Sequence, residues 1–257
     1  MLRGLYTAVS GMITQEKRQE TITNNMANVS TNGFKEDTLN VKSFDEVLLQ
    51  NYDKQVNGIN VKNQIGSISL GSQIDGVSTN FTQGTFISTD EPLDFAVNGA
   101  GFFKVEDGSG NQFYTRNGHF SLDNQGYLVD DNGNYVIGKN INTNQEDKVK
   151  LNSSDVTSDT SGIISDNGKK NYKLSTYTFA DNNSLIKIGD NLYSGNGAIE
   201  DQNGGIKQNT LEGSNVNVID SMVDMMTTMR AYEANQKVIS AIDETLGKAV
   251  NEVGSVR

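Results

Sequence analysis

Carboxylates and a single histidine, His119, are the side chains of this 257-residue sequence best suited to chemistry. An imidazole acts as a general base for a serine nucleophile only where a serine and a carboxylate converge on it, and the sequence contains no such nucleophile motif. Two carboxylates could cleave a glycosidic bond, but among 32 acidic residues such a pair has no distinctive pattern. We therefore predict a protein that is not an enzyme, with a wall-cutting glycosidase as an alternative class.

Acidic turns could hold calcium, so we compare one of them with the EF-hand pattern. Asp130, Asn132 and Asn134 fit the first, third and fifth positions of that loop. The sixth position is then Tyr135 rather than glycine, and the twelfth is Ile141 rather than glutamate. With no cysteine and one histidine, the chain also lacks the ligands of thiolate zinc sites, iron–sulfur clusters and two-histidine motifs. We expect no catalytic residue, no metal and no cofactor.

The charge balance argues against nucleic acid as a partner. The chain has 21 basic and 32 acidic residues, and its net charge of −11 repels a phosphate backbone. The end segments 1–45 and 212–257 carry net charges of 0 and −3, which leaves −8 for residues 46–211.

No apolar run approaches the roughly 18 residues of a membrane-spanning helix, and the N-terminal segment lacks a cleavage pattern. We expect a protein that does not span a membrane and that, if exported, uses no cleaved signal peptide.

The N-terminal segment has the spacing of an amphipathic helix. Its apolar residues advance by three or four positions, at Leu2, Leu5, Val9 and Met12, with Tyr6 and Ile13 beside them. The positions that continue this stripe are polar, so the helix needs a partner surface of matching polarity. Residues 28–33 then supply the turn-forming side chains that end a helix.

The C-terminal segment carries the longest periodic pattern in the chain. Seam positions alternate by four and three residues, at Val218, Met222, Met225, Met229, Tyr232, Gln236, Ile239, Asp243 and Leu246. No proline or glycine interrupts residues 218–246, so the pattern predicts a helix of about 30 residues. Two such helices at opposite ends of one chain are expected to pack against each other as a coiled coil.

The middle of the chain reads as short strands and tight turns. Between Phe95 and Val136, apolar and polar side chains alternate between glycine-containing turns, and Asn117-Gly118 and Asn132-Gly133 predict type I′ hairpin turns. Residues 140–170 are too polar to assign. The fold class predicted is α+β, with four parts: an N-terminal helical segment 1–45, an extended or β connection 46–92, a β-rich domain 93–211 and a C-terminal helix 212–257.

Short motifs at both ends and in the middle of the chain carry a family resemblance. The N-terminal motif consists of Ala8, Gly11-Met12, Gln15, Asn24-Asn25, Ala27-Asn28, Thr31 and Gly33-Phe34-Lys35. The C-terminal motif consists of Ser214-Asn215-Val216, Met222, Arg230-Ala231-Tyr232-Glu233, Asn235 and Lys237. The core motifs include Gln83-Gly84, Gly101-Phe102-Phe103, Tyr114-Thr115-Arg116, Gly118 and Leu211-Glu212. Together they resemble the signature of bacterial flagellar axial proteins of the rod and hook class, most closely a distal rod subunit.

The resemblance implies a structural subunit of the flagellar basal-body rod. Such a subunit self-assembles into a helical tube that transmits motor torque for motility, with its terminal helices near the axis and its β-rich domain outside. Its partners would be copies of itself, other flagellar axial proteins and the type III export apparatus, which uses no cleaved signal. The alternatives are a hook-type axial subunit and a secreted β-rich adhesin or carbohydrate-acting protein.

Fourteen residues are candidates for helix packing and assembly. They are the apolar and polar stripe positions of the two terminal segments, namely Leu5, Val9, Met12, Asn24, Asn25, Asn28, Met222, Met225, Met229, Arg230, Tyr232, Glu233, Ile239 and Leu246. The sequence does not separate contacts within one chain from contacts between chains.

Overall fold

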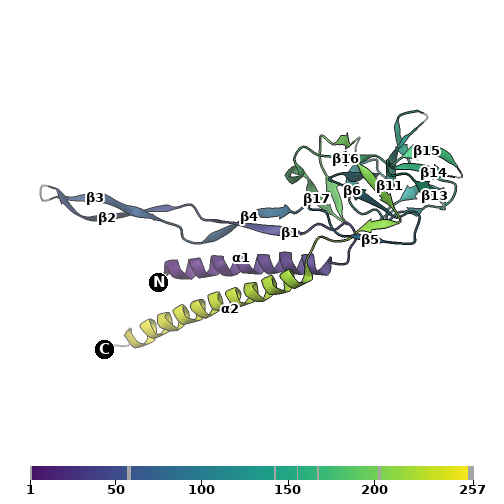
Figure 1. The fold of residues 1–257 in the computed structure, drawn as a ribbon. Coiled ribbons are helices and arrows are strands. Elements are labelled where there is room, and N and C mark those ends of the chain that lie inside the picture. Colours follow the sequence, from purple (N-terminus) through teal and green to yellow (C-terminus); the bar gives the residue numbers. More distant parts are fainter. Residues whose placement is uncertain are drawn as a thin grey trace. The chain divides into compact units, whose positions relative to one another are not determined.

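The computed structural model describes residues 2–56, 59–141, 143–154, 156–166, 168–201 and 204–253 (Figure 1). The chain divides into two compact units. The terminal unit comprises Met1–Met26, Asp37–Ser78 and Val218–Arg257, and the β body comprises Ala27–Glu36 and Thr79–Asn217. The fold is α+β as predicted, with a helix at each end of the chain and a β-rich body.

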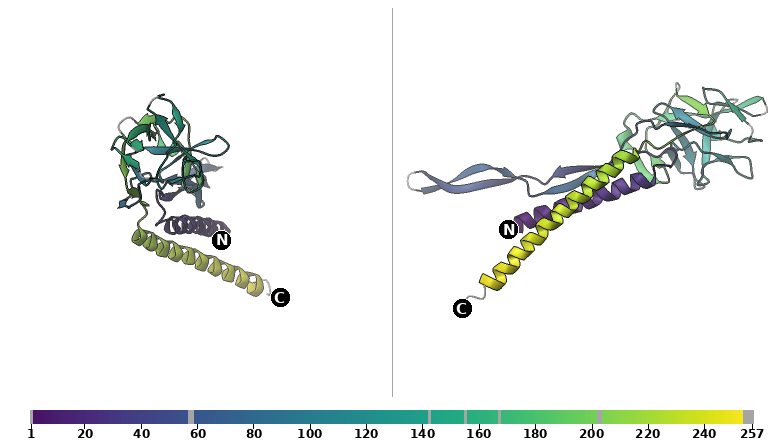
Figure 2. Two further views of the ribbon diagram at one scale, coloured as in Figure 1. Left: turned by 90° about the vertical axis from the view of Figure 1, so that its right-hand side faces the viewer. Right: turned by 60° about the horizontal axis from the view of Figure 1, so that its bottom comes forward.

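The terminal unit contains two long helices and two ribbons of paired strands (Figure 2). Its elements are α1 (Leu2–Ala27), β1 (Asp37–Ser43), β2 (Val47–Val56), β3 (Ile59–Ile68), β4 (Ser72–Thr79), α2 (Val218–Lys248) and a π-helical turn, Ala249–Val253. Strand β1 pairs with β4, and β2 pairs with β3 in a long antiparallel hairpin. Helix α2 has 31 residues, close to the predicted length of about 30.

Glycines of α1 mark where α2 comes near. A methyl group built on Gly11 would lie 3.0 Å from Nδ2 of Asn235, and one built on Gly4 would lie 3.8 Å from Cδ1 of Ile242. The contacts advance by seven residues along each helix in opposite directions, so α1 and α2 run antiparallel here. The neighbouring atoms belong to side chains of α2, so the glycines leave room for those side chains.

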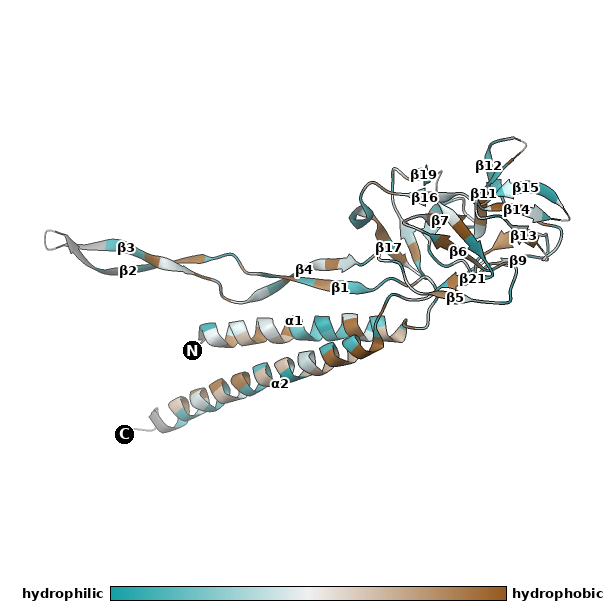
Figure 3. Ribbon diagram, in the orientation of Figure 1, coloured by the Kyte–Doolittle hydropathy of each residue, from teal (hydrophilic) through white to brown (hydrophobic). Residues whose placement is uncertain are grey.

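The least exposed stripe of α2 is shifted by one residue from the predicted seam at four positions. It consists of Val218, Ser221, Met225, Thr228, Tyr232, Asn235, Ile239, Ile242 and Leu246, all buried or half-buried. Met222 and Met229 are instead 50% and 45% exposed. Ser221 and Thr228 are 8% and 3% exposed, although neither is apolar. Figure 3 shows apolar and polar residues interleaved along α2, so hydropathy alone does not distinguish the two stripes.

A stripe of hydroxyl and amide side chains on α1 meets the strand segments of the same unit. Thr7 Oγ1 donates to the carbonyl of Leu70 at 3.0 Å, and Thr14 Oγ1 lies 3.0 Å from Oγ of Ser72. Neither threonine is among the polar positions that continue the predicted apolar stripe. The N-terminal helix therefore satisfies part of its polar surface inside its own unit.

The β body is built from short antiparallel strands. They are β5 (Phe86–Ser88), β6 (Phe95–Asn98), β7 (Phe102–Glu106), β8 (Gln112–Thr115), β9 (Ser121–Leu122), β10 (Leu128–Val129), β11 (Tyr135–Asn140), β12 (Glu146–Lys148), β13 (Val156–Ser158), β14 (Ile163–Asp166), β15 (Lys169–Lys173), β16 (Thr176–Thr178), β17 (Ile186–Gly189), β18 (Leu192–Ser194), β19 (Ile199–Asp201), β20 (Gly205–Gln208) and β21 (Thr210–Glu212), with a 3-10 turn at Asn182–Ser184. The main sheet follows the order β13-β14-β15-β11-β7-β8-β18-β17.

Two clusters of buried side chains form the core of the body. The larger cluster consists of aliphatic side chains and phenylalanine rings, and includes Phe95, Phe103 and Leu128. The smaller is aromatic, with Phe102 and Tyr193 at its centre. Four short strands, β12 to β15, begin within residues 140–170, which the sequence left unassigned.

The hairpin turns differ from the predicted type. Four of them share an Asp-x-x-Gly pattern, in which the glycine N–H donates to the aspartate carbonyl and the glycine adopts a positive φ of 78–87°: Asp107 with Gly110, Asp123 with Gly126, Asp130 with Gly133 and Asp159 with Gly162. This is a turn closed by a left-handed glycine, one residue longer than type I′. Type I′ requires a positive φ at both central residues, and neither Asn117 nor Asn132 has one, so that prediction is wrong. Asp190-Asn191, between β17 and β18, does have two positive φ angles.

The same turn geometry accounts for the residues compared with a calcium loop. Oδ1 of Asp130 accepts hydrogen bonds from the backbone N–H groups of Asn132 and Asn134, each at 2.9 Å. Oδ2 accepts from Nδ2 of Asn134, also at 2.9 Å. The carboxylate thus stabilises its own hairpin turn.

Candidate functional site

A buried carboxylate, Glu212, is the centre of the most elaborate polar cluster in the β body. Its Oε1 accepts from Nζ of Lys35 at 2.6 Å and from the backbone N–H of Gly84 at 2.9 Å. Its Oε2 accepts from Nη1 of Arg116 at 3.2 Å. Nζ of Lys35 also donates to the carbonyl of Thr82 at 2.7 Å. The three charged side chains are at most 1% exposed, and we call this cluster the Glu212 junction.

Segments far apart in the chain supply the Glu212 junction. Lys35 lies eight residues beyond the end of α1, Arg116 directly follows β8, and Glu212 ends β21, where it pairs with Phe86 of β5. The guanidinium of Arg116 lies 4.8 Å from the centre of the Phe102 ring, so one face of the cation is covered by an aromatic side chain.

Two glycines allow the backbone to close around these charges. Gly33 has a φ of +70°, and a Cβ there would lie 2.5 Å from the backbone nitrogen of Asn117. A Cβ on Gly84 would lie 2.0 Å from the carbonyl oxygen of Gly213. Distances under 3.0 Å leave no room for a side chain, which explains why glycine stands at both positions.

Further hydrogen bonds tie the segment after α1 to the segment before α2. The N–H of Gly33 donates to the carbonyl of Glu212 at 2.7 Å, and the N–H of Glu36 donates to Oδ1 of Asn215 at 2.8 Å. Nδ2 of Asn215 donates to the carbonyl of Asn80 at 2.8 Å, and the N–H of Asn80 donates to the carbonyl of Glu36 at 2.8 Å. Residues 33–36 and 212–215 are thus fixed to each other within the body.

The charges of the junction are two cations and one anion in a buried place. Burial lowers the pKa of Lys35, and its hydrogen bond to Glu212 opposes that shift. Burial likewise lowers the pKa of Arg116, against the attraction of Glu212. Removing the one anion, Glu212, would leave two buried cations without a carboxylate, which is strongly destabilising. The arrangement is suited to holding chain segments together rather than to reacting with a substrate.

The predicted residues of the N-terminal segment occupy different environments. Leu5, Val9 and Met12 are half-buried in α1, and Asn24 is exposed. Asn25 is 4% exposed: its Nδ2 donates to the carbonyl of Asp37 at 2.8 Å, and its Oδ1 accepts from the N–H of Asp37 at 3.0 Å. The side-chain amide of Asn25 thereby bonds both the N–H and the carbonyl of Asp37 in β1, as a residue on a neighbouring antiparallel strand would.

The remaining N-terminal candidate, Asn28, forms part of a turn. Its Oδ1 accepts from Oγ1 of Thr31 at 3.2 Å, and its carbonyl accepts from the N–H of Thr31 at 3.2 Å. This turn comes directly after α1 and precedes the Gly33–Lys35 segment of the junction.

The predicted residues of the C-terminal segment lie on two sides of α2. The half-buried group is Met225, Tyr232, Ile239 and Leu246. The exposed group is Met222, Met229, Arg230 and Glu233. The structure therefore distributes the candidates along two helices rather than gathering them in one place, and their role in assembly stays a prediction.

His119 lies between two carboxylates. Its Nδ1 is 2.7 Å from Oδ1 of Asp94, and its Nε2 is 3.7 Å from Oδ1 of Asp131. The hydrogen bond to Asp94 raises the pKa of His119. Both ring nitrogens thus face acidic groups rather than a serine hydroxyl. In the part of the chain that the structure describes, no group of three or more His, Asp or Glu residues is arranged to hold a metal ion.

The Glu212 junction was missed by reasoning from the sequence. Lys35, Arg116 and Glu212 each lie in a motif that carries the family resemblance, but 177 residues separate Lys35 from Glu212 and 96 separate Arg116 from it. The available signal was chemical: each motif places a charged residue beside apolar or aromatic ones. Charges in such settings are rarely buried unless they are paired.

Comparison with known proteins places this architecture in a family. Residues 5–35 match the family model described as flagella basal body rod protein, residues 96–166 match the flagellar hook protein FlgE/F/G D1 domain, and residues 207–252 match the flagellar basal body rod FlgEFG protein C-terminal model. The first and last models cover most of α1 and α2, and the last also includes Glu212. Among the helices that the structure describes, none is both long enough and apolar enough to cross a membrane.

Full-length relatives agree with these family models. The flagellar basal-body rod protein FlgG of Bacillus subtilis is 35% identical, over 98% of this chain and 99% of the relative. FlgG of Agrobacterium fabrum is 35% identical, over 95% of this chain and 96% of the relative. The flagellar hook-basal body complex protein FlhO of Bacillus subtilis is 30% identical over the whole of both chains. With matches at both termini, in the body and along its full length, this chain belongs to the family of structural proteins that form the flagellar basal-body rod.

Proposed function

We propose that this rod-family subunit assembles with copies of itself, and with other axial proteins of the flagellum, into a helical tube. The observation that carries the proposal is an apolar surface on α2. Ile219 is 72% exposed, Met222 50%, Val223 48% and Met226 53%. A soluble protein rarely leaves such a continuous apolar stripe in water unless another surface covers it.

The two terminal helices form the assembling part of the subunit in this proposal, packed as an antiparallel coiled coil. The approach of Gly4 to Ile242 and of Gly11 to Asn235 supports that packing. So does the three-and-four spacing of the least exposed stripe of α2. Contacts with neighbouring copies would then cover the apolar residues that this pairing leaves exposed.

The Glu212 junction has a mechanical role in this proposal. A rod that transmits torque needs subunits in which the chain segments that enter and leave the β body are firmly held. The junction fixes those segments by ion pairs and hydrogen bonds among Lys35, Glu36, Arg116, Glu212 and Asn215. Charge-assisted hydrogen bonds of this kind are among the stronger ones in proteins, so they hold the two segments in place.

Placement and export follow from the same proposal. The helical ends would lie near the axis of the tube, and residues 46–211, with a net charge of −8, would include the outer, water-facing part. The subunit would reach the basal body through the flagellar export apparatus without a cleaved signal peptide and would carry no enzymatic activity. The four-part division at residues 45, 92 and 211 stays a prediction.

Electron microscopy of the purified protein under polymerising conditions tests the proposal. We expect tubes of uniform diameter, and we expect the double variant Met222→Ser/Met226→Ser to remain monomeric. Ile186→Ser is the matched control, because Ile186 is 69% exposed but lies in the β body. Absence of tubes from the unaltered protein, or normal swimming by a strain that lacks the gene, would contradict the proposal.

A further inference from the structure

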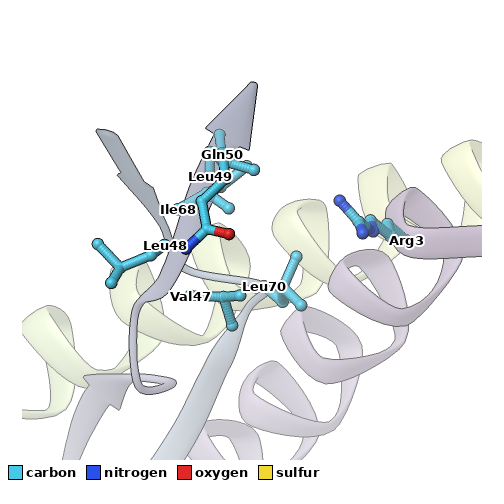
Figure 4. A pocket seen from close by; sticks show the side chains of 7 residues that line it. All are labelled: Arg3, Val47, Leu48, Leu49, Gln50, Ile68 and Leu70. Carbon is cyan, nitrogen blue, oxygen red and sulfur yellow. The ribbon is translucent and has the colours of Figure 1, made fainter. Parts of the chain in front are cut away.

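A pocket of about 360 Å³ lies in the terminal unit, at the base of the β2–β3 hairpin (Figure 4). Val47, Leu48 and Ile68 contribute apolar side chains to its lining. Gln50 and Arg3 add an amide and a guanidinium. This mixed lining favours no single class of ligand.

Eight Asn-Gly pairs give the chain a chemical reactivity that is separate from its assembly. Asparagine is a labile residue, because the backbone nitrogen of the next residue can attack its side-chain amide. A following glycine presents that nitrogen without a side chain to hinder the attack. Five of the pairs lie wholly within the described residues, and they begin at Asn32, Asn98, Asn117, Asn132 and Asn196. The fold places these five pairs in different surroundings.

Two of the five pairs are closed by a hydrogen bond of their glycine. The N–H of Gly33 donates to the carbonyl of Glu212 at 2.7 Å, and this glycine is buried. The N–H of Gly133 donates to the carbonyl of Asp130 at 3.0 Å. A nitrogen that donates such a bond must give it up before it attacks a side chain, and this adds to the barrier. The asparagines before Gly33 and Gly133 should therefore react slowly.

The side chain of Asn117 is held at both ends. Its Oδ1 accepts from the N–H of His119 at 3.1 Å, and its Nδ2 donates to Oδ2 of Asp131 at 3.0 Å. The backbone beside it is confined as well, because a Cβ on Gly118 would overlap the carbonyl oxygen of Phe95. The Asn117 amide cannot turn toward the nitrogen of Gly118 without losing both hydrogen bonds, so this pair is also closed.

The remaining two pairs are exposed to different degrees of restraint. Asn98 ends β6 and pairs there with Gly205 of β20, so the strand ladder restrains the peptide that joins it to Gly99. Asn196 and Gly197 lie in the loop between β18 and β19, and both are exposed. Among the described residues, no hydrogen bond holds the Asn196 amide or the Gly197 N–H. A Cβ built on Gly197 would meet no atom within 4 Å.

We propose that Asn196-Gly197 is the site of spontaneous deamidation in the folded chain. The nitrogen of Gly197, once its proton has passed to a base in the solvent, forms a bond to Cγ of Asn196. The bond from Cγ to Nδ2 breaks, and Nδ2 leaves as ammonia after taking a proton from water. The product is a succinimide ring. Water is the only co-reactant, so the reaction needs neither a partner nor a second copy of the chain.

Water then opens the succinimide at either of its two carbonyl carbons. Attack at Cγ breaks the bond from Cγ to the Gly197 nitrogen and leaves aspartate, with the main chain unchanged. Attack at the main-chain carbonyl carbon breaks the bond from that carbon to the same nitrogen and leaves isoaspartate, in which the main chain runs through Cβ and Cγ. Both products add one negative charge to a chain whose net charge is −11.

The packing on each side of the pair determines what isoaspartate changes. A Cβ built on Gly195 would lie 3.1 Å from Cε1 of Phe179, and Ala198 packs against the aromatic core cluster. The next residue, Ile199, begins β19 and pairs with Thr178 of β16. Isoaspartate lengthens the main chain between Gly195 and Ala198, so we expect it to displace Ala198 and weaken the pairing of β16 with β19.

Peptide mapping by mass spectrometry tests the site. The protein is kept for several days in mildly alkaline buffer, one sample folded and one in concentrated urea, and is then digested at acidic pH, where the reaction is slow. In the folded sample we expect Asn196 to be modified at least tenfold faster than Asn32, Asn117 or Asn132, with Asn98 between them. In urea we expect similar rates at all five, because the dipeptide is the same.

Asn196→Gln is the matched variant, because glutamine must close a larger ring and reacts far more slowly. It should remove the fast reaction and leave the slow rates at the other pairs unchanged. Ion exchange should show a more acidic species that grows with time in the unaltered protein and is nearly absent from the variant. The proposal is wrong if Asn196 reacts no faster than the closed pairs in the folded sample, or if any of the other four described pairs reacts faster. It is also wrong if Asn196 reacts in urea but stays intact in the folded protein.

Discussion

Single residues of the β body fix the chain segments that lead to the helices. Glu212 accepts hydrogen bonds from Lys35, Gly84 and Arg116, which come from three separate parts of the sequence. Each of these residues lies in a motif that resembles the flagellar axial proteins, and the structure supplies the physical reason for the residue types. The motifs place two cations, an anion and close-packed glycines in one buried place.

Glu212→Gln is expected to destabilise the β body by about 3 kcal/mol, because it leaves Lys35 and Arg116 buried without a counter-charge. Urea unfolding monitored by circular dichroism measures the change. Glu20→Gln is the control: Glu20 pairs with Lys17 on the surface of α1, where both side chains are at least half exposed. An unfolding midpoint of Glu212→Gln equal to that of the unaltered protein would show that the ion pairs do not stabilise the fold.

His119 predicts a pH dependence of stability. Its pKa is raised in the folded protein, first by the hydrogen bond to Asp94, so the folded state binds more protons than the unfolded state between the two pKa values. The stabilisation is complete below the unfolded value of about 6.5 and is lost as the pH rises through the folded value. The imidazole is partly exposed, so the expected effect is below about 1 kcal/mol. Urea unfolding at pH 5.5 and pH 8.5 should show this difference in the unaltered protein and not in His119→Gln.

At the scale of elements, sequence periodicity located the helices but not their contact surfaces. The longest pattern predicted a helix of about 30 residues, and α2 runs from Val218 to Lys248. The seam was shifted by one residue at Met222 and Met229 because hydrophobicity favours methionine over Ser221 and Thr228. Which side of α2 is covered depends on segments distant in sequence: Gly4 and Gly11, which lie near Ile242 and Asn235, are more than 200 residues away from them.

Turns show the same limit at shorter range. The glycine positions were enough to predict hairpins in the β body, and hairpins are present. The turn type was wrong because the aspartate three residues before Gly133 accepts backbone N–H groups and lengthens the turn. An Asn-Gly pair alone therefore does not determine the turn type when an aspartate precedes it.

The helices are expected to be less protected than the body before assembly. Amides from Thr7–Met26 and Met222–Leu246 should exchange with solvent faster in the monomer than those of β7 and β11, whose side chains lie in the core. In assembled tubes the helix amides should slow by more than tenfold, because neighbouring copies cover them. Hydrogen exchange followed by mass spectrometry measures both states. Strong protection of the helices in the monomer would show that their stability does not depend on assembly.

At the scale of the whole molecule, the β body depends on residues near both ends of its sequence. A fragment of residues 27–217 keeps Lys35 and Glu212, and we expect it to unfold cooperatively with an intact aromatic circular dichroism signal. A fragment of residues 37–211 lacks both and leaves the guanidinium of Arg116 buried without a carboxylate. We expect this shorter fragment to lose the cooperative transition. Equal melting temperatures of the two fragments would contradict the role assigned to the junction.

The distance in sequence between Lys35 and Glu212 also sets the timing of folding. At about 5–20 residues per second, a ribosome delivers Glu212 roughly 9 to 35 s after Lys35. Throughout that interval Glu212 has not been synthesised, so the growing chain cannot form the buried ion pair between Lys35 and Glu212. The last fifth of the sequence therefore decides when the β body can complete its buried ion pairs.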